Sequence, residues 1–362
     1  MDRRRLLTGL GAAGILALLP GCSEDDIKKI LDTCPTDPAA TGGIDWTPDL
    51  GHPLFWGVQD LGTAQGAPRD MLIYYPSLEG SPTNAPIHQR CLTRWPVVLF
   101  LHGQPPTGVP TAGYHRKWTL IPSVLARCGY VVVVPNHGAN LPDDMSVSAA
   151  LADINYVRTA WPNAQWVEKR AEMTVVSGHS FGALLAATIA GAHPEFGALV
   201  SFSGGFHNLT NFPSLLRSVK MPSFFMWAKG EGVILPFEDL DSGGVWDSLP
   251  QNKYAAAFQG EHFDYLPASL LQPGDFRGPC DLVGGVAADL AALFISANVP
   301  VPLSTTRVGV DLKPPQVQLT QKQEFYAGAH LQGIAGFQTH QGCRLDLKWS
   351  VDGASGSRRI GP

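Results

Sequence analysis

The sequence has little net charge and no long basic run beyond its first positions. Its 362 residues carry 26 Lys and Arg against 31 Asp and Glu, a net charge of −5, and its isoelectric point is near 6.1. Nucleic-acid binding needs a basic patch that neutralises phosphates, so we expect no nucleic-acid partner. The chain also lacks a Cys-x-x-Cys pair, a His/Cys cluster and internal repeats, which argues against structural zinc and against repeat architectures.

The N-terminal apolar run is too short for a comfortable membrane span. It covers residues 6–19 and follows a basic run at residues 3–5, a pattern that predicts an export signal over residues 1–21. Small residues before Cys22 resemble a bacterial lipoprotein signal, in which Cys22 is lipidated and anchors the protein to the cell envelope. The basic run also resembles a twin-arginine signal. The alternative is a plain cleaved signal, which would leave a soluble periplasmic or secreted protein.

The cysteine content fits export, because an oxidising compartment permits disulfides. Besides Cys22 there are five cysteines, an odd number. Cys128 ends an apolar helix-like segment and is the expected buried free thiol. Three pairings of the remaining four are possible, and they are Cys34, Cys91, Cys280 and Cys343.

The rest of the chain divides by composition into a tether, a body and an extension. Residues 22–43 are polar and rich in Asp, Pro and Thr, which predicts a flexible tether. Residues 44–299 form the expected body, and residues 300–362 are an extension in which prolines and short alternating runs predict a small β-rich appendage.

Within the body, apolar runs typical of buried strands alternate with helix-like segments. We expect strands over 55–58, 69–76, 96–101, 129–135, 198–203, 223–228 and 254–258, another from 173 to the turn at Ser180, and helices over 118–128, 146–160, 281–298 and directly after Ser180. This alternation predicts an α/β fold with a mostly parallel central sheet and helices on both faces.

One pentapeptide organises the functional interpretation: residues 178–182, Gly-His-Ser-Phe-Gly, between an apolar strand and an alanine-rich helix. A serine that must project from a tight strand-to-helix turn needs small neighbours, which explains a glycine two residues to either side. The N–H groups that open the helix then point toward the serine and favour negative charge there.

This pentapeptide resembles the nucleophile elbow of the α/β-hydrolases. The chain is similar to the branch that includes platelet-activating-factor-acetylhydrolase-like and dienelactone-hydrolase-like esterases, chlorophyllases and cutinase-like polyesterases. The resemblance covers roughly residues 71–298 and is carried by 97–103, 129–137, 178–182 and 260–264. It implies an α/β-hydrolase fold and a serine esterase, with Ser180 as nucleophile and no metal or organic cofactor.

A serine nucleophile needs a base, and in this fold the acid and then the histidine follow the serine along the chain. Only His262, His330 and His340 lie well after Ser180 with acids in between. The family carries its base in the loop after the last short strand of the body, which selects His262. His330 and His340 are expected at the surface of the extension.

The acid is expected after the strand at 223–228. The family's aspartate falls at or beside Gly232, and Glu231 is one position away. Glutamate can orient an imidazole and stabilise its cation, so Glu231 is the first candidate, with Asp239 and Asp241 as alternatives.

An oxyanion hole needs two backbone N–H groups. One should come from Phe181, directly after the nucleophile, and the resemblance assigns the other to Gln104, because Pro105 has no N–H. His102 is interpreted as a structural residue of the same loop. His179 is expected to pack beside the elbow rather than act as the base.

Together these residues predict hydrolysis of a small-molecule or lipid-like carboxylic ester through an acyl-enzyme. The chain has no insertion long enough for a large lid, so we expect a fairly open cleft. Two alternatives stay open: the same fold acting as a peptidase, thioesterase or haloperoxidase-like enzyme, and a surface-anchored binding lipoprotein that has lost activity.

Overall fold

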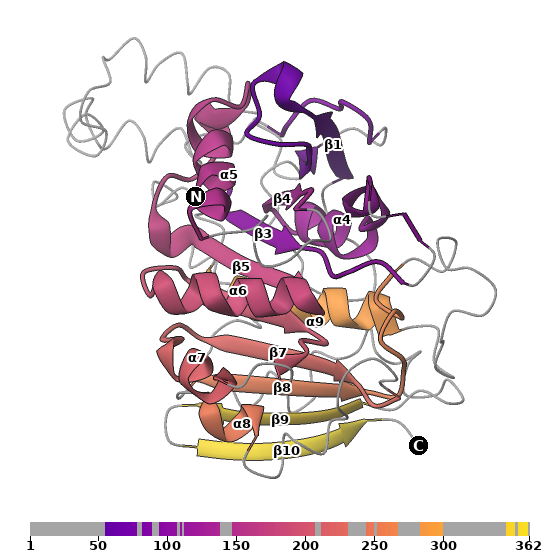
Figure 1. Cartoon of the computed structure of the whole chain (residues 1–362), viewed down its shortest axis with the longest axis vertical. Coiled ribbons are helices and arrows are strands. Elements are labelled where there is room, and N and C mark those ends of the chain that lie inside the picture. The colour runs from indigo at the N-terminus through magenta and orange to yellow at the C-terminus, as the bar shows by residue number, and fades with distance from the viewer. Residues whose placement is uncertain are drawn as a thin grey trace, which may run out of the picture.

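The computed structural model describes residues 55–77, 82–88, 94–106, 109–110, 112–137, 147–206, 211–230, 244–249, 252–266, 283–299, 345–351 and 354–360. Over these residues the chain forms one ten-stranded sheet with helices on both faces (Figure 1). The strands are β1 (Phe55–Leu61), β2 (Met71–Ser77), β3 (Val97–Leu101), β4 (Val131–Pro135), β5 (Thr174–His179), β6 (Ala198–Phe202), β7 (Ser223–Ala228), β8 (Lys253–Phe258), β9 (Leu345–Val351) and β10 (Ala354–Ile360). The α-helices are α4 (Leu120–Arg127), α5 (Val147–Thr159), α6 (Phe181–Ala192), α7 (Phe212–Ser218), α8 (Val245–Ser248) and α9 (Val283–Asn298).

The sheet is mixed and mostly parallel. Its strand order is β1-β2-β4-β3-β5-β6-β7-β8-β9-β10. The six central strands, β4 to β8 in that order, run parallel, and antiparallel pairs flank them at both edges. The predicted α/β class and the predicted parallel core are confirmed. Because parallel strands end at the same edge, the loops after β3, β5, β7 and β8 converge there.

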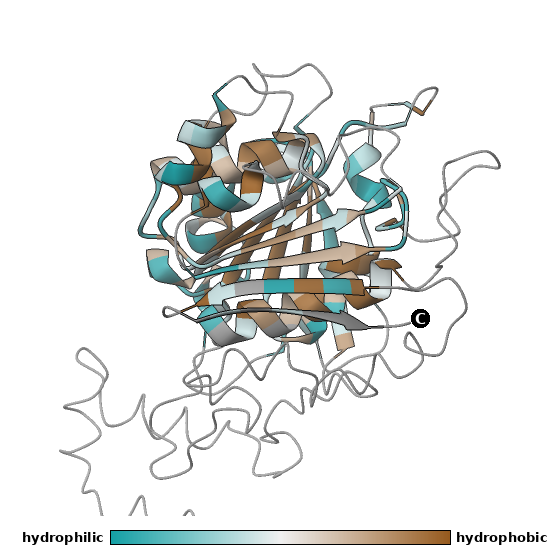
Figure 2. Ribbon diagram, turned by 90° about the horizontal axis from the view of Figure 1, so that it is seen from below, coloured by the Kyte–Doolittle hydropathy of each residue, from teal (hydrophilic) through white to brown (hydrophobic). Residues whose placement is uncertain are grey.

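The core sits between the central strands and the helices. Every residue of β3, β4, β5, β6 and β7 is buried, as expected of strands covered on both faces. Helices α5, α6 and α7 pack in succession, and α4 packs against α9. Hydrophobic residues gather in the sheet and on the helix faces that meet it, while hydrophilic residues lie toward the outside (Figure 2).

The described part of the C-terminal extension continues the central sheet and does not form a separate appendage. Strand β9 pairs with β8 along its length, from Lys253 opposite Ser350 to Phe258 opposite Leu345. Strand β10 then forms the outer edge. An ion pair between Lys229, just after β7, and Asp346 on β9 also ties the extension to the body.

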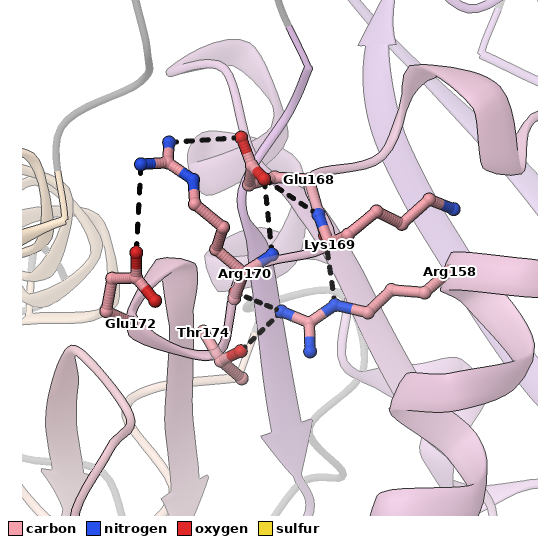
Figure 3. Close-up of polar contacts among 6 residues, drawn as sticks. All are labelled: Arg158, Glu168, Lys169, Arg170, Glu172 and Thr174. Atoms are coloured by element: carbon pink, nitrogen blue, oxygen red, sulfur yellow. Dashed lines mark hydrogen bonds and ion pairs between the residues drawn. The ribbon is translucent and has the colours of Figure 1, made fainter.

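A polar cluster fixes the amino end of β5 (Figure 3). Ser180 follows the other end of this strand. The Arg158 guanidinium, from the last turn of α5, donates to the carbonyls of Glu168 and Arg170 at 2.9 and 2.8 Å and to Thr174 Oγ1 at 2.6 Å. The Glu168 carboxylate accepts from the Arg170 backbone N–H and guanidinium, both at 3.2 Å. Charge-assisted bonds of this kind hold the strand entry firmly.

The predicted export signal at residues 1–21, the lipidation site Cys22 and the tether at residues 22–43 lie outside the described residues. Among the described residues, no helix is both long and apolar enough to cross a membrane. Cys128 is buried and is not part of a disulfide, as predicted, and burial raises its pKa well above the ordinary value. The cysteines outside the described residues are Cys22, Cys34, Cys91, Cys280 and Cys343.

Candidate active site

Ser180 occupies a strained turn between β5 and α6. Its backbone has φ 54° and ψ −120°, a sparsely populated combination for a residue with a side chain, which costs on the order of 1–3 kcal/mol. Its N–H donates to the Phe202 carbonyl of β6 at 2.8 Å, and its carbonyl accepts from the Ala183 N–H at 3.0 Å. Ser180 itself is only partly buried. The turn therefore holds one partly exposed serine at the carboxyl edge of the sheet.

The two glycines that bracket Ser180 are required by close backbone contacts. A Cβ on Gly178 would lie 2.3 Å from the Gly182 carbonyl oxygen. A Cβ on Gly182 would lie 2.1 Å from the carbonyl oxygen of Leu101 at the end of β3. The Gly-x-Ser-x-Gly spacing thus lets the turn close on itself and lets α6 contact the neighbouring strand.

The loop after β3 packs directly on Ser180. A Cβ built on Gly103 would lie 2.8 Å from Ser180 Cβ and 2.8 Å from His179 Nδ1. The structure therefore brings the predicted oxyanion loop against Ser180, and only glycine fits at this contact.

The two predicted oxyanion donors flank Ser180 on these elements. Phe181 is the first residue of α6, and N–H groups in the first turn of a helix have no acceptor within the helix. Gln104 is exposed and follows Gly103 in the packed loop. Both backbone N–H groups belong to segments that the structure holds beside the serine.

His262 lies in a tight turn after β8. The Glu261 N–H donates to Asp264 Oδ2 at 2.8 Å, and the Asp264 N–H donates to the Glu261 carbonyl at 3.1 Å. The His262 side chain is buried, with its ring centroid 4.6 Å from that of His179 and 4.9 Å from that of Phe263. His262 thus packs against His179, the residue that precedes Ser180, although 82 residues lie between the two histidines in the sequence.

His179 is fully buried and joins these segments. Its Nε2 lies 2.8 Å from the His262 backbone oxygen. A carbonyl can only accept, so Nε2 carries the proton. Burial, with the nearby charge of His262, lowers the pKa of His179 well below its ordinary value. The other ring nitrogen, Nδ1, is a weak base because of this low pKa, and it lies against the Gly103 backbone. His179 therefore packs beside the Ser180 turn, as expected.

The chain after β7 begins beside the loop that carries His262. The Lys229 N–H donates to the Phe258 carbonyl at 2.7 Å, and the Gly230 N–H donates to the Gly260 carbonyl at 2.8 Å. The predicted acids come next in the sequence, Glu231 directly after Gly230 and then Asp239 and Asp241, and all three lie outside the described residues. His330 and His340 also lie outside them.

A second group of buried histidines packs at the loop after β3, the predicted oxyanion loop. His102 Nδ1 donates to the Gly103 carbonyl at 2.8 Å, and its ring stacks on His137 with centroids 3.8 Å apart. Burial lowers the pKa of His102 to about 4. Burial, together with electrostatic repulsion from the neighbouring His102, lowers the pKa of His137 to about 2. Both rings are therefore neutral at neutral pH, which agrees with a structural role for His102.

The sequence interpretation missed the contacts that connect these loops. Ser203, at φ 45° after β6, donates through its hydroxyl to Tyr265 at 3.2 Å. The Tyr265 ring in turn lies 5.5 Å from that of His179. No spacing rule could reveal these contacts, because they join residues of different loops.

Comparison with protein-family models finds no match for this chain, and comparison with curated protein sequences finds none either. Among the described residues, no three His, Cys, Asp or Glu side chains are arranged to hold a metal ion. Any function must therefore be argued from the geometry of the site itself.

Proposed function

We propose that this protein is a serine hydrolase of the α/β-hydrolase fold that cleaves carboxylic esters through an acyl-enzyme. The observation that carries the proposal is the positive-φ turn that presents Ser180 at the carboxyl edge of the sheet, with Gly103 packed against it. A strained serine turn between a strand and a helix is the structural context that a nucleophile elbow requires. The His262 turn packed on His179 supplies the candidate base.

In this mechanism His262 takes the proton from Ser180 Oγ as the oxygen attacks the ester carbonyl. The carbonyl π electrons move to oxygen, and the N–H groups of Phe181 and Gln104 stabilise the resulting oxyanion. Collapse of this intermediate breaks the bond to the leaving alcohol, which takes its proton from His262. A water molecule then repeats the sequence, with His262 again as base, and releases the acid and Ser180.

We assign the acid of the triad to the chain after β7, with Glu231 first and Asp239 or Asp241 next. The support is the hydrogen bond from the Gly230 N–H to the Gly260 carbonyl, because Gly230 directly precedes Glu231 and Gly260 lies two residues before His262. A carboxylate here would orient the imidazole and stabilise its cation.

Turnover of p-nitrophenyl butyrate by the purified chain tests the proposal. Ser180→Ala and His262→Asn should each lower kcat by at least about 10³-fold, because the nucleophile and base act as a unit. Ser180→Ala should also abolish covalent labelling by a fluorophosphonate, read by intact mass. If Ser180→Ala turns over the ester as fast as the unsubstituted protein, the proposal is wrong.

Two matched controls are available outside the site. Ser123 lies on α4, where its hydroxyl donates to the Leu120 carbonyl, and His193 follows α6 and pairs with Glu195. Ser123→Ala and His193→Asn should keep kcat within about twofold. The same assay on p-nitroanilides and thioesters separates an esterase from a peptidase or thioesterase, and absence of both labelling and turnover would favour a binding lipoprotein.

A further inference from the structure

We infer that His179, the residue before the nucleophile, is a positioning residue that holds the His262 loop in register with the Ser180 turn. The inference rests on the proposed function and adds a residue with a separate role to it. His179 is the side chain through which three loops that are distant in sequence make contact.

The contact with the His262 loop is a directed hydrogen bond. The Nε2–H of His179 donates to the His262 carbonyl at 2.8 Å, and the two rings pack with their centroids 4.6 Å apart. Because the accepting group is the backbone of His262 itself, the bond sets the position of the Cα from which the base projects. A neighbouring side-chain contact could not set the base so directly.

The contact with the oxyanion loop is made by the other edge of the same ring. Nδ1 of His179 faces Gly103 so closely that a Cβ there would lie 2.8 Å away. The ring is also enclosed by aromatic rings, with centroid distances of 4.7 Å to Trp118 and 5.5 Å to Tyr265. The imidazole is therefore in contact with both loops, and it couples the position of one loop to that of the other.

The protonation state of His179 suits this positioning role. Complete burial keeps His179 neutral, so Nε2 stays a donor and Nδ1 keeps its lone pair. When His262 accepts the proton of Ser180, only one of the two packed rings, which are tilted by 51° to each other, becomes charged. The two histidines thus have different roles: His262 exchanges the proton with Ser180, and His179 keeps the loop in place.

A pair of amide variants tests the inference. In His179→Gln, the amide nitrogen stands as many bonds from Cβ as Nε2 of histidine does, so it can still donate to the His262 carbonyl. In His179→Asn, the amide is one bond shorter and cannot reach. We expect Gln to retain kcat within about threefold, while Asn lowers kcat by about 10²-fold with KM nearly unchanged, the loss typical of a reacting group displaced by about 1 Å.

A purely structural role would not lower kcat in the Asn variant alone while leaving KM nearly unchanged. A double variant then tests whether the effect passes through His262. In a His262→Asn background, His179→Asn should cause no further loss, because its effect passes through His262. If His179→Asn does not fold, His179→Phe replaces it, since it keeps a ring among the aromatic residues and donates nothing.

The inference is overturned if the folded Asn or Phe variant matches Gln in kcat, or if the loss persists when His262 is absent. These outcomes are separate from failure of the proposed function. Loss of turnover in Ser180→Ala with full turnover in His179→Asn would remove the inference alone, whereas full turnover in Ser180→Ala would remove both.

Discussion

Gly182 offers a direct test of how the nucleophile turn is packed. On helix propensity alone, Gly182→Ala should stabilise α6, because alanine is favoured over glycine inside a helix by up to about 1 kcal/mol. The structure predicts the opposite. The new Cβ would lie 2.1 Å from the Leu101 carbonyl oxygen and 2.5 Å from that of His102.

The loss of stability expected for Gly182→Ala follows from how far these two contacts fall short of a normal packing distance. A carbon atom and a carbonyl oxygen pack at about 3.5 Å, so a contact of 2.1 Å requires α6 and the end of β3 to separate by up to about 1.4 Å. Both neighbours are backbone atoms of buried segments and cannot rotate away as a flexible side chain would. Overpacking of this kind costs about 3 kcal/mol, and displacing the Ser180 turn by about 1 Å should lower kcat by about 10²-fold.

The matched control is Gly285, near the start of α9, where an added Cβ would meet nothing within 4 Å. Gly285→Ala should leave turnover unchanged and raise stability by up to about 1 kcal/mol. Urea unfolding followed by circular dichroism gives both free energies, and ester turnover gives both rates. If Gly182→Ala and Gly285→Ala shift the unfolding midpoint equally, the packing argument is refuted.

Two further predictions concern buried carboxylates outside the site. Burial raises the pKa of Asp153 to about 6, despite its ion pair with Arg69, from an ordinary 3.8, so its ionisation costs up to about 3 kcal/mol. The free energy of unfolding should therefore fall as the pH rises from about 4 to 6. Asp153→Asn should not show this fall, and an equal pH dependence of the two proteins in urea unfolding would contradict the prediction. Hydrogen bonds from Arg170 and Lys169 hold the pKa of Glu168 below its ordinary 4.5 even though burial acts to raise it. Glu168→Gln should therefore cost about 1–2 kcal/mol at pH 7, a deficit that shrinks as the pH falls through the lowered pKa; an equal deficit at low pH would show that the charge is not responsible.

Much of the sheet could be predicted because most of its strands are apolar runs that are recognisable in the sequence. The run at residues 129–135 is almost entirely apolar, and its last five residues form β4, a fully buried strand inside the sheet between β2 and β3. By contrast, β10 has the sequence Ala-Ser-Gly-Ser-Arg-Arg-Ile, without the alternation that marks a half-buried strand. Its backbone pairing with β9 decides its conformation, and a sequence pattern cannot express that pairing.

By itself, the sequence determined the local part of the site. The glycines around Ser180 specify a turn between a strand and a helix, because that requirement is steric and acts within five residues. The tertiary structure alone decided what surrounds the turn. The contact of Gly103 with Ser180, and the bond from His179 to the His262 backbone, depend on parallel strands that end at one edge of the sheet. Such contacts join residues about 80 positions apart, and only the folded sheet brings them together.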